Sequence, residues 1–167
     1  MKIIITEQQI KHLLYEKLEY AAGVLPIARS TGRILIHKRG YDIPHGGTWA
    51  TFGGKPDPNE TPKQTARREF REESGYEGPI LKMKASHVYK RKNGFRFYNN
   101  LILVANEFKV TMIGKETVDG EVEVIDAKWV TLDELKKMKD LHFGLEDLIK
   151  NSEEQIRNYI KIYTNKK

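Results

Sequence analysis

The arrangement of apolar and polar positions along the chain predicts both strands and helices. Apolar runs rich in β-branched and aromatic residues predict five strands, over about 21–28, 33–38, 80–91, 96–106 and 122–130. Pro26 lies inside the first run, which favours an edge strand or a bulge because proline has no N–H to donate. Asn93-Gly94 joins the third and fourth runs and indicates a hairpin. Residues 39–53 are rich in Gly and Pro and are expected to form a loop.

Three segments have the pattern of a capping box, in which Thr precedes Glu or Gln by three residues. They begin at Thr6, Thr61 and Thr131, and they predict helices over about 7–19, over 62–74 and shortly after Thr131. Apolar residues at helical spacing predict a longer amphipathic helix over about 144–163. The strands and helices alternate without regular βαβ periodicity, which indicates an α/β fold with a mixed sheet packed by helices.

Length and composition narrow the classes of protein. The 167 residues favour one domain over 1–167. The chain has no cysteine, which excludes disulfides, thiolate metal sites and thiol nucleophiles, so any metal must be held by oxygen or imidazole. No apolar run approaches the roughly 18 residues of a membrane span, and the apolar start is too short for a signal peptide. We therefore expect a cytoplasmic protein without a membrane partner, and both a monomer and a homodimer remain open.

The positive charge of the chain is concentrated in one segment. The formal net charge is +6, and no acidic residue lies between Glu77 and Glu107. This stretch carries six basic residues, namely Lys82, Lys84, Lys90, Arg91, Lys92 and Arg96. The basic character is therefore a local property of the predicted hairpin and not of the whole chain.

One face of the predicted helix over 62–74 concentrates negative charge. Glu69, Glu72 and Glu73 fall within an arc of about 100° and repel one another, in the half of the helix where the macrodipole disfavours anions. A solvated acidic face with i,i+4 ion pairs would explain this pattern in an ordinary helix. The preceding Gly-Gly turn and the remote Glu60 favour instead a site for Mg²⁺ or Mn²⁺, which prefer carboxylate oxygens.

This segment resembles the Nudix box of the MutT-like Nudix hydrolases. The matching positions are Gly54, Glu60, Arg68, Glu69, Phe70, Glu72, Glu73, Gly75 and Tyr76, with Phe70 standing where the family more often has Leu, Ile or Val. A looser resemblance extends over about 20–140. It implies a Nudix α/β/α sandwich with a mixed curved sheet and a loop–helix–loop motif that holds one to three Mg²⁺ or Mn²⁺. The activity implied is cleavage of the pyrophosphate linkage in a nucleoside diphosphate bonded to another group.

The resemblance also implies roles for individual residues. Glu69, Glu72 and Glu73 would be metal ligands together with the carbonyl of Gly53, and Glu69 is the family's most usual general base. Arg68 would orient a glutamate of this group, and Glu60 would hold the loop and the helix together. Many relatives supply one more carboxylate from a loop before the last conserved strand. The chain offers four candidates there, of which the spacing to Trp129 favours Glu123 and then Glu121, over Glu116 and Asp119. If Glu123 lies in the strand instead, it is a solvent-facing residue.

The basic hairpin is the candidate substrate surface. A two-residue turn at Asn93-Gly94 would set Arg91 opposite Arg96 and Tyr89 opposite Tyr98. Aromatic rings interleaved with cations can stack a base and hold phosphates. Charges at an exposed hairpin tip also serve simply to block edge-to-edge pairing. The candidate substrate-binding residues are Arg39, Trp49, Lys90, Arg96 and Tyr98.

Three functions follow from these patterns. The first is a Mg²⁺-dependent Nudix pyrophosphohydrolase that acts on a nucleotide or nucleotide derivative. The second is an RNA 5′-end pyrophosphohydrolase, which the basic hairpin would suit. The third is a non-catalytic Nudix module that binds a nucleotide or RNA; the complete set of glutamates argues against it, because binding-only members commonly lose box carboxylates.

Overall fold

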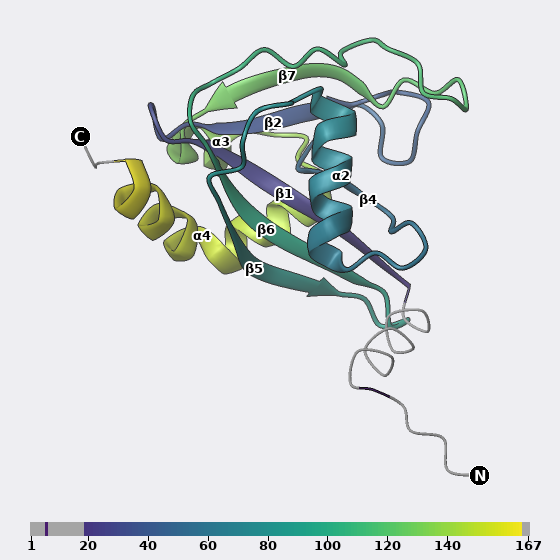
Figure 1. Cartoon of the computed structure of the whole chain (residues 1–167), viewed down its shortest axis with the longest axis horizontal. Helices are drawn as coiled ribbons and strands as arrows, with labels where there is room; N and C mark the ends of the chain where they lie inside the picture. Colours follow the sequence, from purple (N-terminus) through teal and green to yellow (C-terminus); the bar gives the residue numbers. More distant parts are fainter. Residues whose placement is uncertain (1–5, 7–18, 165–167) are drawn as a thin grey trace.

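A computed structural model describes residue 6 and residues 19–164 (Figure 1). The helix predicted over about 7–19 falls almost entirely outside the described residues. The described helices are α2 (Pro62–Ser74), α3 (Leu132–Lys137) and α4 (Phe143–Thr164). In this part of the chain, no helix has both the length and the apolar character needed to cross a bilayer.

The strands form one mixed sheet. They are β1 (Tyr20–Ala28), β2 (Ile34–Arg39), β3 (Trp49–Ala50), β4 (Phe52–Gly54), β5 (Lys82–Lys90), β6 (Arg96–Val104) and β7 (Val124–Val130). The main order is β3-β2-β1-β6-β5, while β4 pairs with β1 and β7 pairs with β2. The pair β1–β6 is parallel along its whole length, and the other pairs are antiparallel.

Residues 49–54 bridge a gap inside the sheet. Strands β1 and β2 are in register only at Ile27 and Ile34, and they diverge from there. The chain pairs with β2 through β3 and then crosses to β1 through β4. The prediction of a loop over 39–53 was therefore wrong for its last residues. Strands of two and three residues are stabilised by their neighbours and leave no pattern of their own in the sequence.

Pro26 lies in a central strand of the sheet. Of the two alternatives that the sequence favoured, an edge strand or a bulge, the edge strand is wrong. On the side away from β6, β1 pairs with β4 over Ala22–Val24 and with β2 at Ile27. Pro26 falls between these two pairings, so its missing N–H removes no bond of a registered pair on that side.

The hairpin register differs from the predicted one. Lys90 lies opposite Arg96, and Tyr89 lies opposite Phe97. The turn has three residues instead of two, because the N–H of Gly94 donates to the carbonyl of Arg91 and Gly94 takes the left-handed conformation, with φ of 91°. The longer turn shifts the cross-strand pairs next to it by one residue, but it still brings two cations face to face.

Helices cover both faces of the sheet, which gives the three layers seen in Figure 1. Helix α2 packs through Ala66 and Phe70 on a core cluster that includes Phe52 and Ile102. Helices α3 and α4 pack on the opposite face, over a second cluster that includes Leu25, Leu101 and Leu103. Helix α4 extends one residue beyond the predicted 144–163 at each end, and Ser152 interrupts its helical backbone.

Replacement of Phe70 tests the packing of α2. Phe70 is fully buried against Phe52 and Tyr76, with ring centroids 5.5 Å away in both cases. Phe70→Ala should lower the free energy of unfolding by about 3–5 kcal/mol, because it leaves a cavity beneath the helix. Urea denaturation measures the change. The control Tyr41→Ala, at an aromatic residue that is 71% exposed, should change it by less than about 0.5 kcal/mol. Equal losses in the two variants would contradict this packing.

Candidate functional site

Helix α2 is fixed at both ends by its own sequence. Thr61 accepts from the backbone N–H of Gln64, and the Gln64 side chain accepts from the N–H of Thr61, with Pro62 in the first turn. Gly75 ends the helix in the left-handed conformation and donates to the carbonyl of Arg71. These caps set the helix rotation and thereby the direction in which its glutamates point.

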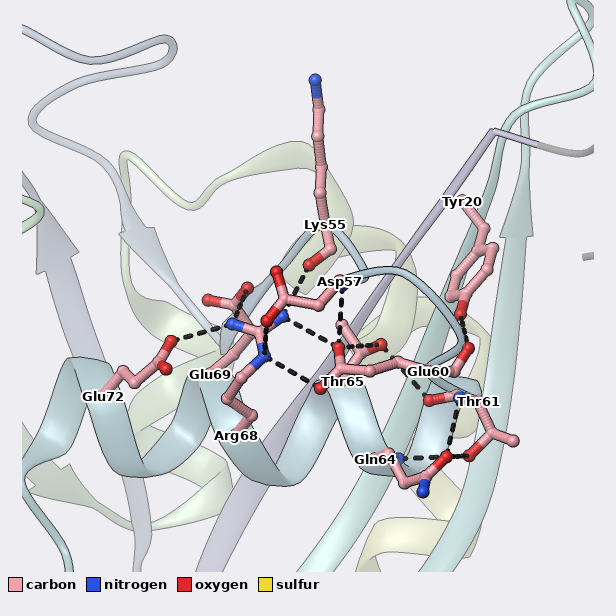
Figure 2. A network of polar contacts seen from close by, with 10 residues as sticks. All are labelled: Tyr20, Lys55, Asp57, Glu60, Thr61, Gln64, Thr65, Arg68, Glu69 and Glu72. Carbon is pink, nitrogen blue, oxygen red and sulfur yellow. Dashed lines mark hydrogen bonds and ion pairs between the residues drawn. The ribbon is translucent and has the colours of Figure 1, made fainter. Parts of the chain in front are cut away.

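Arg68 is the centre of the polar network in Figure 2. Its Nε and Nη2 donate to the two carboxylate oxygens of Glu60, at 2.9 and 3.0 Å. Its Nη1 donates to Glu69 at 2.9 Å and to Glu72 at 2.8 Å, and its Nη2 also donates to the carbonyl of Lys55 at 2.8 Å. These contacts, the hydrogen bonds with Glu60 first, raise the pKa of Arg68 above its ordinary value. Arg68 thus joins the loop before α2 to two acidic residues of the helix.

Glu60 fastens that loop to the helix. Its Oε2 accepts from the N–H of Asp57 at 2.9 Å and from the hydroxyl of Thr65 at 3.0 Å, and its carbonyl accepts from the hydroxyl of Tyr20 at 2.6 Å. The hydrogen bonds from Arg68 are the main cause that lowers the pKa of Glu60. Glu60 is therefore a charged support of the loop, and its oxygens are already occupied.

Glu73 points into the protein beneath the Gly-Gly turn. It is buried, and its Oε2 accepts from the backbone N–H of Gly53 at 2.7 Å. Burial first, and then the charge of Glu69, raise the pKa of Glu73 well above its usual range, while the Gly53 hydrogen bond acts in the opposite direction. A carboxylate held here in ionised form requires positive charge nearby.

Glu69 and Glu123, with Glu72 and Glu73, make up what we call the acidic group. Burial raises the pKa of Glu69 to about 7, against the effect of Arg68, and the charges of Glu72 and Glu123 raise it further. Burial is also the main cause that raises the pKa of Glu123, which directly precedes β7 and so lies in the loop, as one of the sequence alternatives predicted. Glu72 has the most exposed of the α2 carboxylates that Arg68 contacts, at 57%.

These residues fit a divalent cation in their chemistry. Among the described residues, no group of three or more acidic or histidine side chains stands at metal-binding spacing, and Arg68 engages two of the carboxylates, those of Glu69 and Glu72. The carboxylates nevertheless repel one another across a shared, partly buried space, which a hard cation would relieve. A Cβ on Gly54 would lie 2.6 Å from Glu69 Oε1, so a larger residue here would displace this carboxylate from its position against the backbone.

The charge of Arg39 acts both on the acidic group and on two histidines. Its charge lowers the pKa values of Glu73 and Glu123 and also those of His37 and His142. Its Nε donates to the carbonyl of Pro44 at 3.1 Å, which holds the side chain at the base of the 40–48 loop. The charge of Arg39, one of the predicted substrate residues, therefore acts on the carboxylates and on His142.

The other predicted substrate residues separate into two places. Lys90, Arg96 and Tyr98 share the sheet face toward α2, and the Tyr98 ring meets Tyr20 edge-on at 5.7 Å. Trp49 lies on the opposite face, packed against the α4 core cluster with its ring 4.2 Å from Lys128 Nζ.

His142 and Phe143 form a second group that the sequence analysis missed. Their rings lie 4.2 Å apart, and His45 approaches both, at 5.1 and 5.2 Å. From the hairpin, Tyr89 lies 5.4 Å from Phe143, and the Arg91 guanidinium lies 4.8 Å from the same ring. We call these five residues the aromatic group. His142 also accepts from the N–H of Gly144 at the start of α4, a local capping role that gives no sequence signal of binding.

The chain matches the family model described as the NUDIX domain over residues 17–151. The putative 8-oxo-dGTP diphosphatase 3 of Mycobacterium tuberculosis is 33% identical over 117 residues, which cover 64% of this chain and 54% of that protein. The CTP pyrophosphohydrolase of Escherichia coli is 38% identical over 64 residues, or 38% of this chain and 47% of that protein. The chain thus spans about half the length of the curated relatives it matches.

A solved structure, the MutT NUDIX hydrolase of Burkholderia pseudomallei, has a TM-score of 0.57 at 24% identity, over 81% of this chain and 98% of that one. This likeness confirms the predicted α/β sandwich with its mixed sheet.

His37 makes the stability of the protein dependent on pH. It is fully buried, and neither ring nitrogen has a hydrogen-bond partner among the described residues. Burial, followed by Arg39 and His142, lowers its pKa from 6.5 to about 3. Between pH 6.5 and about pH 3, this histidine is protonated in the unfolded chain but neutral in the folded protein. The free energy of unfolding therefore falls as the pH drops through this range.

Comparison of His37→Leu with the wild type should isolate this effect. Between pH 6 and pH 4 the wild type should lose up to about 1.4 kcal/mol per pH unit more than the variant does, which corresponds to one proton. Urea denaturation at several pH values measures both slopes. The exposed histidine variant His45→Ala serves as the control and should keep the wild-type slope. If the free energy of unfolding changed with pH in the same way in the wild type and in His37→Leu, His37 would not be the source of the pH dependence.

Proposed function

Because the chain belongs to the NUDIX domain family, we propose that it is a metal-dependent pyrophosphohydrolase that cleaves a nucleotide or nucleotide derivative. The observation that carries the proposal is the group formed by Glu69, Glu72, Glu73 and Glu123. Burial, and then the charges of these carboxylates acting on one another, raise the pKa values of Glu69, Glu73 and Glu123, while the charge of Arg39 acts in the opposite direction on Glu73 and Glu123. An arrangement that costs the fold free energy in this way suits a site whose ligand supplies positive charge.

The residues would divide the chemistry between them. Glu69, Glu72, Glu73 and Glu123, with the carbonyl of Gly53, would hold Mg²⁺ or Mn²⁺. When bound, such a cation neutralises charge on the phosphates and makes a coordinated water more acidic.

The chain's own groups would direct the attack of water on phosphorus. Glu69 is the candidate base, and Arg68 fixes its position through the 2.9 Å hydrogen bond. Glu60 holds Arg68 in turn, through two of its N–H groups. Arg39 would stabilise the negative charge of the phosphates.

We assign the aromatic group to the base of the substrate. Its rings offer apolar faces for stacking, and Arg91 adds a cation over Phe143. Because Arg39 lies in electrostatic reach of His142 and of the acidic group, one nucleotide could place its base at the first and its phosphates at the second. The names of the relatives make 8-oxo-dGTP and CTP the first substrates to test.

An RNA 5′ end is the second candidate substrate, favoured by the hairpin. Lys90 and Arg96 lie directly opposite each other, an unfavourable pair unless an anion lies between or beside them. They share their sheet face with Tyr98, next to the loop that carries Glu60. The backbone phosphates of an RNA, which continue beyond the first nucleotide, would reach these two cations.

A substrate panel with Glu72→Gln tests the proposed activity. The panel comprises 8-oxo-dGTP, CTP, other nucleoside triphosphates, nucleotide sugars and 5′-triphosphate RNA, with Mg²⁺ and detection of released phosphate or pyrophosphate. We expect turnover by the wild type and a loss of at least about 100-fold in kcat for Glu72→Gln, because a charged ligand group is lost. The exposed position of Glu72 should leave the fold intact.

Glu77→Gln is the matched control, since Glu77 is an exposed glutamate just beyond α2. It should retain wild-type activity. Undiminished turnover by Glu72→Gln would refute the metal assignment. Tight binding without turnover by the wild type would support the non-catalytic module instead.

Phe143→Ala tests the base assignment. Loss of a stacking ring should weaken substrate binding by about 1–3 kcal/mol, seen as a rise in KM of about 5- to 150-fold with little change in kcat. Tyr163→Ala, a half-buried ring near the other end of α4, is the control and should leave KM unchanged. The same KM in both variants would place the base elsewhere.

A further inference from the structure

Helix α4 lies along β5 in the antiparallel direction. Contacts run from the Lys82 ammonium over the Tyr163 ring, at 4.6 Å, to the Arg91 guanidinium over the Phe143 ring, at 4.8 Å. Between these ends, the Ser86 hydroxyl donates to Gln155 Oε1 at 2.6 Å. From the first contact to the last, the chain advances by nine residues, from Lys82 to Arg91, while α4 runs back by twenty, from Tyr163 to Phe143. These contacts together fix how the helix is aligned along the strand.

A β-bulge changes which side chains of β5 face α4. Ala85 pairs with Asn100 and Val88 pairs with Tyr98, so Ser86 and His87 together stand opposite Asn99. Two consecutive side chains therefore both contact α4, where a regular strand would present only one. Before the bulge, even-numbered residues face the helix; after it, the odd-numbered Tyr89 does so.

The second residue of the bulge, His87, contacts Asp147 of α4. His87 Nε2 lies 2.7 Å from Asp147 Oδ2, with side chains that are 28% and 26% exposed. This oxygen is buried and has no well-aligned hydrogen bond from the described residues, so the His87 ring nitrogen is the polar group that lies against it. The other oxygen, Oδ1, accepts from the Asn151 amide at 3.0 Å, which fixes the carboxylate on the helix.

The same two elements carry two of the five residues of the aromatic group. Tyr89 lies two residues after His87 on the strand, and Phe143 lies four residues before Asp147 on the helix. Strand period and helix period therefore place the His87–Asp147 contact next to the Tyr89–Phe143 contact. Without the bulge, Tyr89 would point to the opposite face of the sheet, because a one-residue slip inverts every later side chain.

We propose that His87 is a positioning residue, which holds the bulge against α4 and thereby keeps Tyr89 and Arg91 in place over Phe143. The consequence for affinity rests on the proposed function, because it takes the aromatic group as the base site. The positioning itself is a property of the fold and is tested without substrate.

The experiment compares His87→Ala with His87→Gln. In His87→Ala the nuclear Overhauser contacts between the Tyr89 and Phe143 rings should be lost, and KM for the substrate found in the panel should rise about tenfold while kcat changes less than about threefold. His87→Gln keeps an N–H donor at similar reach and should restore both readouts. Asp147→Ala should behave like His87→Ala, and the double variant should be no worse than either single one.

Lys136→Ala is the matched control. Its ion pair with Glu153 is also 2.7 Å long and also anchors α4, but to α3 and away from the hairpin. This variant should keep the ring contacts and KM even if it loses stability. Retained Tyr89–Phe143 contacts in His87→Ala would overturn the inference, as would an unchanged KM in a protein that turns over its substrate. If the wild type turns over nothing, the proposed function fails, and the ring contacts still decide the role of His87.

Discussion

The bridge formed by residues 49–54 is the constraint on which both halves of the site depend. At one end, the backbone of Trp49 accepts from the N–H of His142 and donates to the carbonyl of Asp140. At the other end, the N–H of Gly53 donates to Glu73. One short crossing between diverging strands therefore fixes the start of α4 on one face and the acidic side of α2 on the other. A shift of this segment would move both groups at once.

The acidic group illustrates how a site opposes the stability of its fold. Arg68 donates hydrogen bonds to Glu60, Glu69 and Glu72, whereas the hydrogen bond that Glu73 accepts among the described residues comes from the backbone N–H of Gly53. The raised pKa of Glu73 shows that the folded protein disfavours the charge there. The free energy of folding would be better served by an apolar residue at this position. A bound cation would offset this unfavourable charge and so explain why a carboxylate is found at this position.

Local patterns made α2 and its acidic face predictable, whereas features created by strand pairing could not be read from the sequence. The capping box at Thr61, the Gly75 terminus and the spacing of the glutamates are all local signals, and the structure reproduces the helix from 62 to 74. The turn at Gly94 was predicted in the right place with one residue too few, because Asn-Gly fits both turn lengths. His142 and Phe143 become neighbours of Tyr89 only through the packing of α4 on β5. The bulge at Ser86 and His87 likewise has no local signature, since it depends on Asn99 across the ladder.

The two halves of the site are held by different forces, and this difference has a consequence for specificity. The α2 half consists of charges joined through Arg68, so a change in any one of them alters the others. The aromatic half consists of ring contacts contributed by a loop, a hairpin and a helix start, and among the described residues no ion pair joins it to the glutamates. Substitutions at the rings can therefore change the shape offered to a base while the acidic group keeps its geometry. Arg39 is the exception, because its charge acts on both halves, so specificity should be altered through the rings rather than through this arginine.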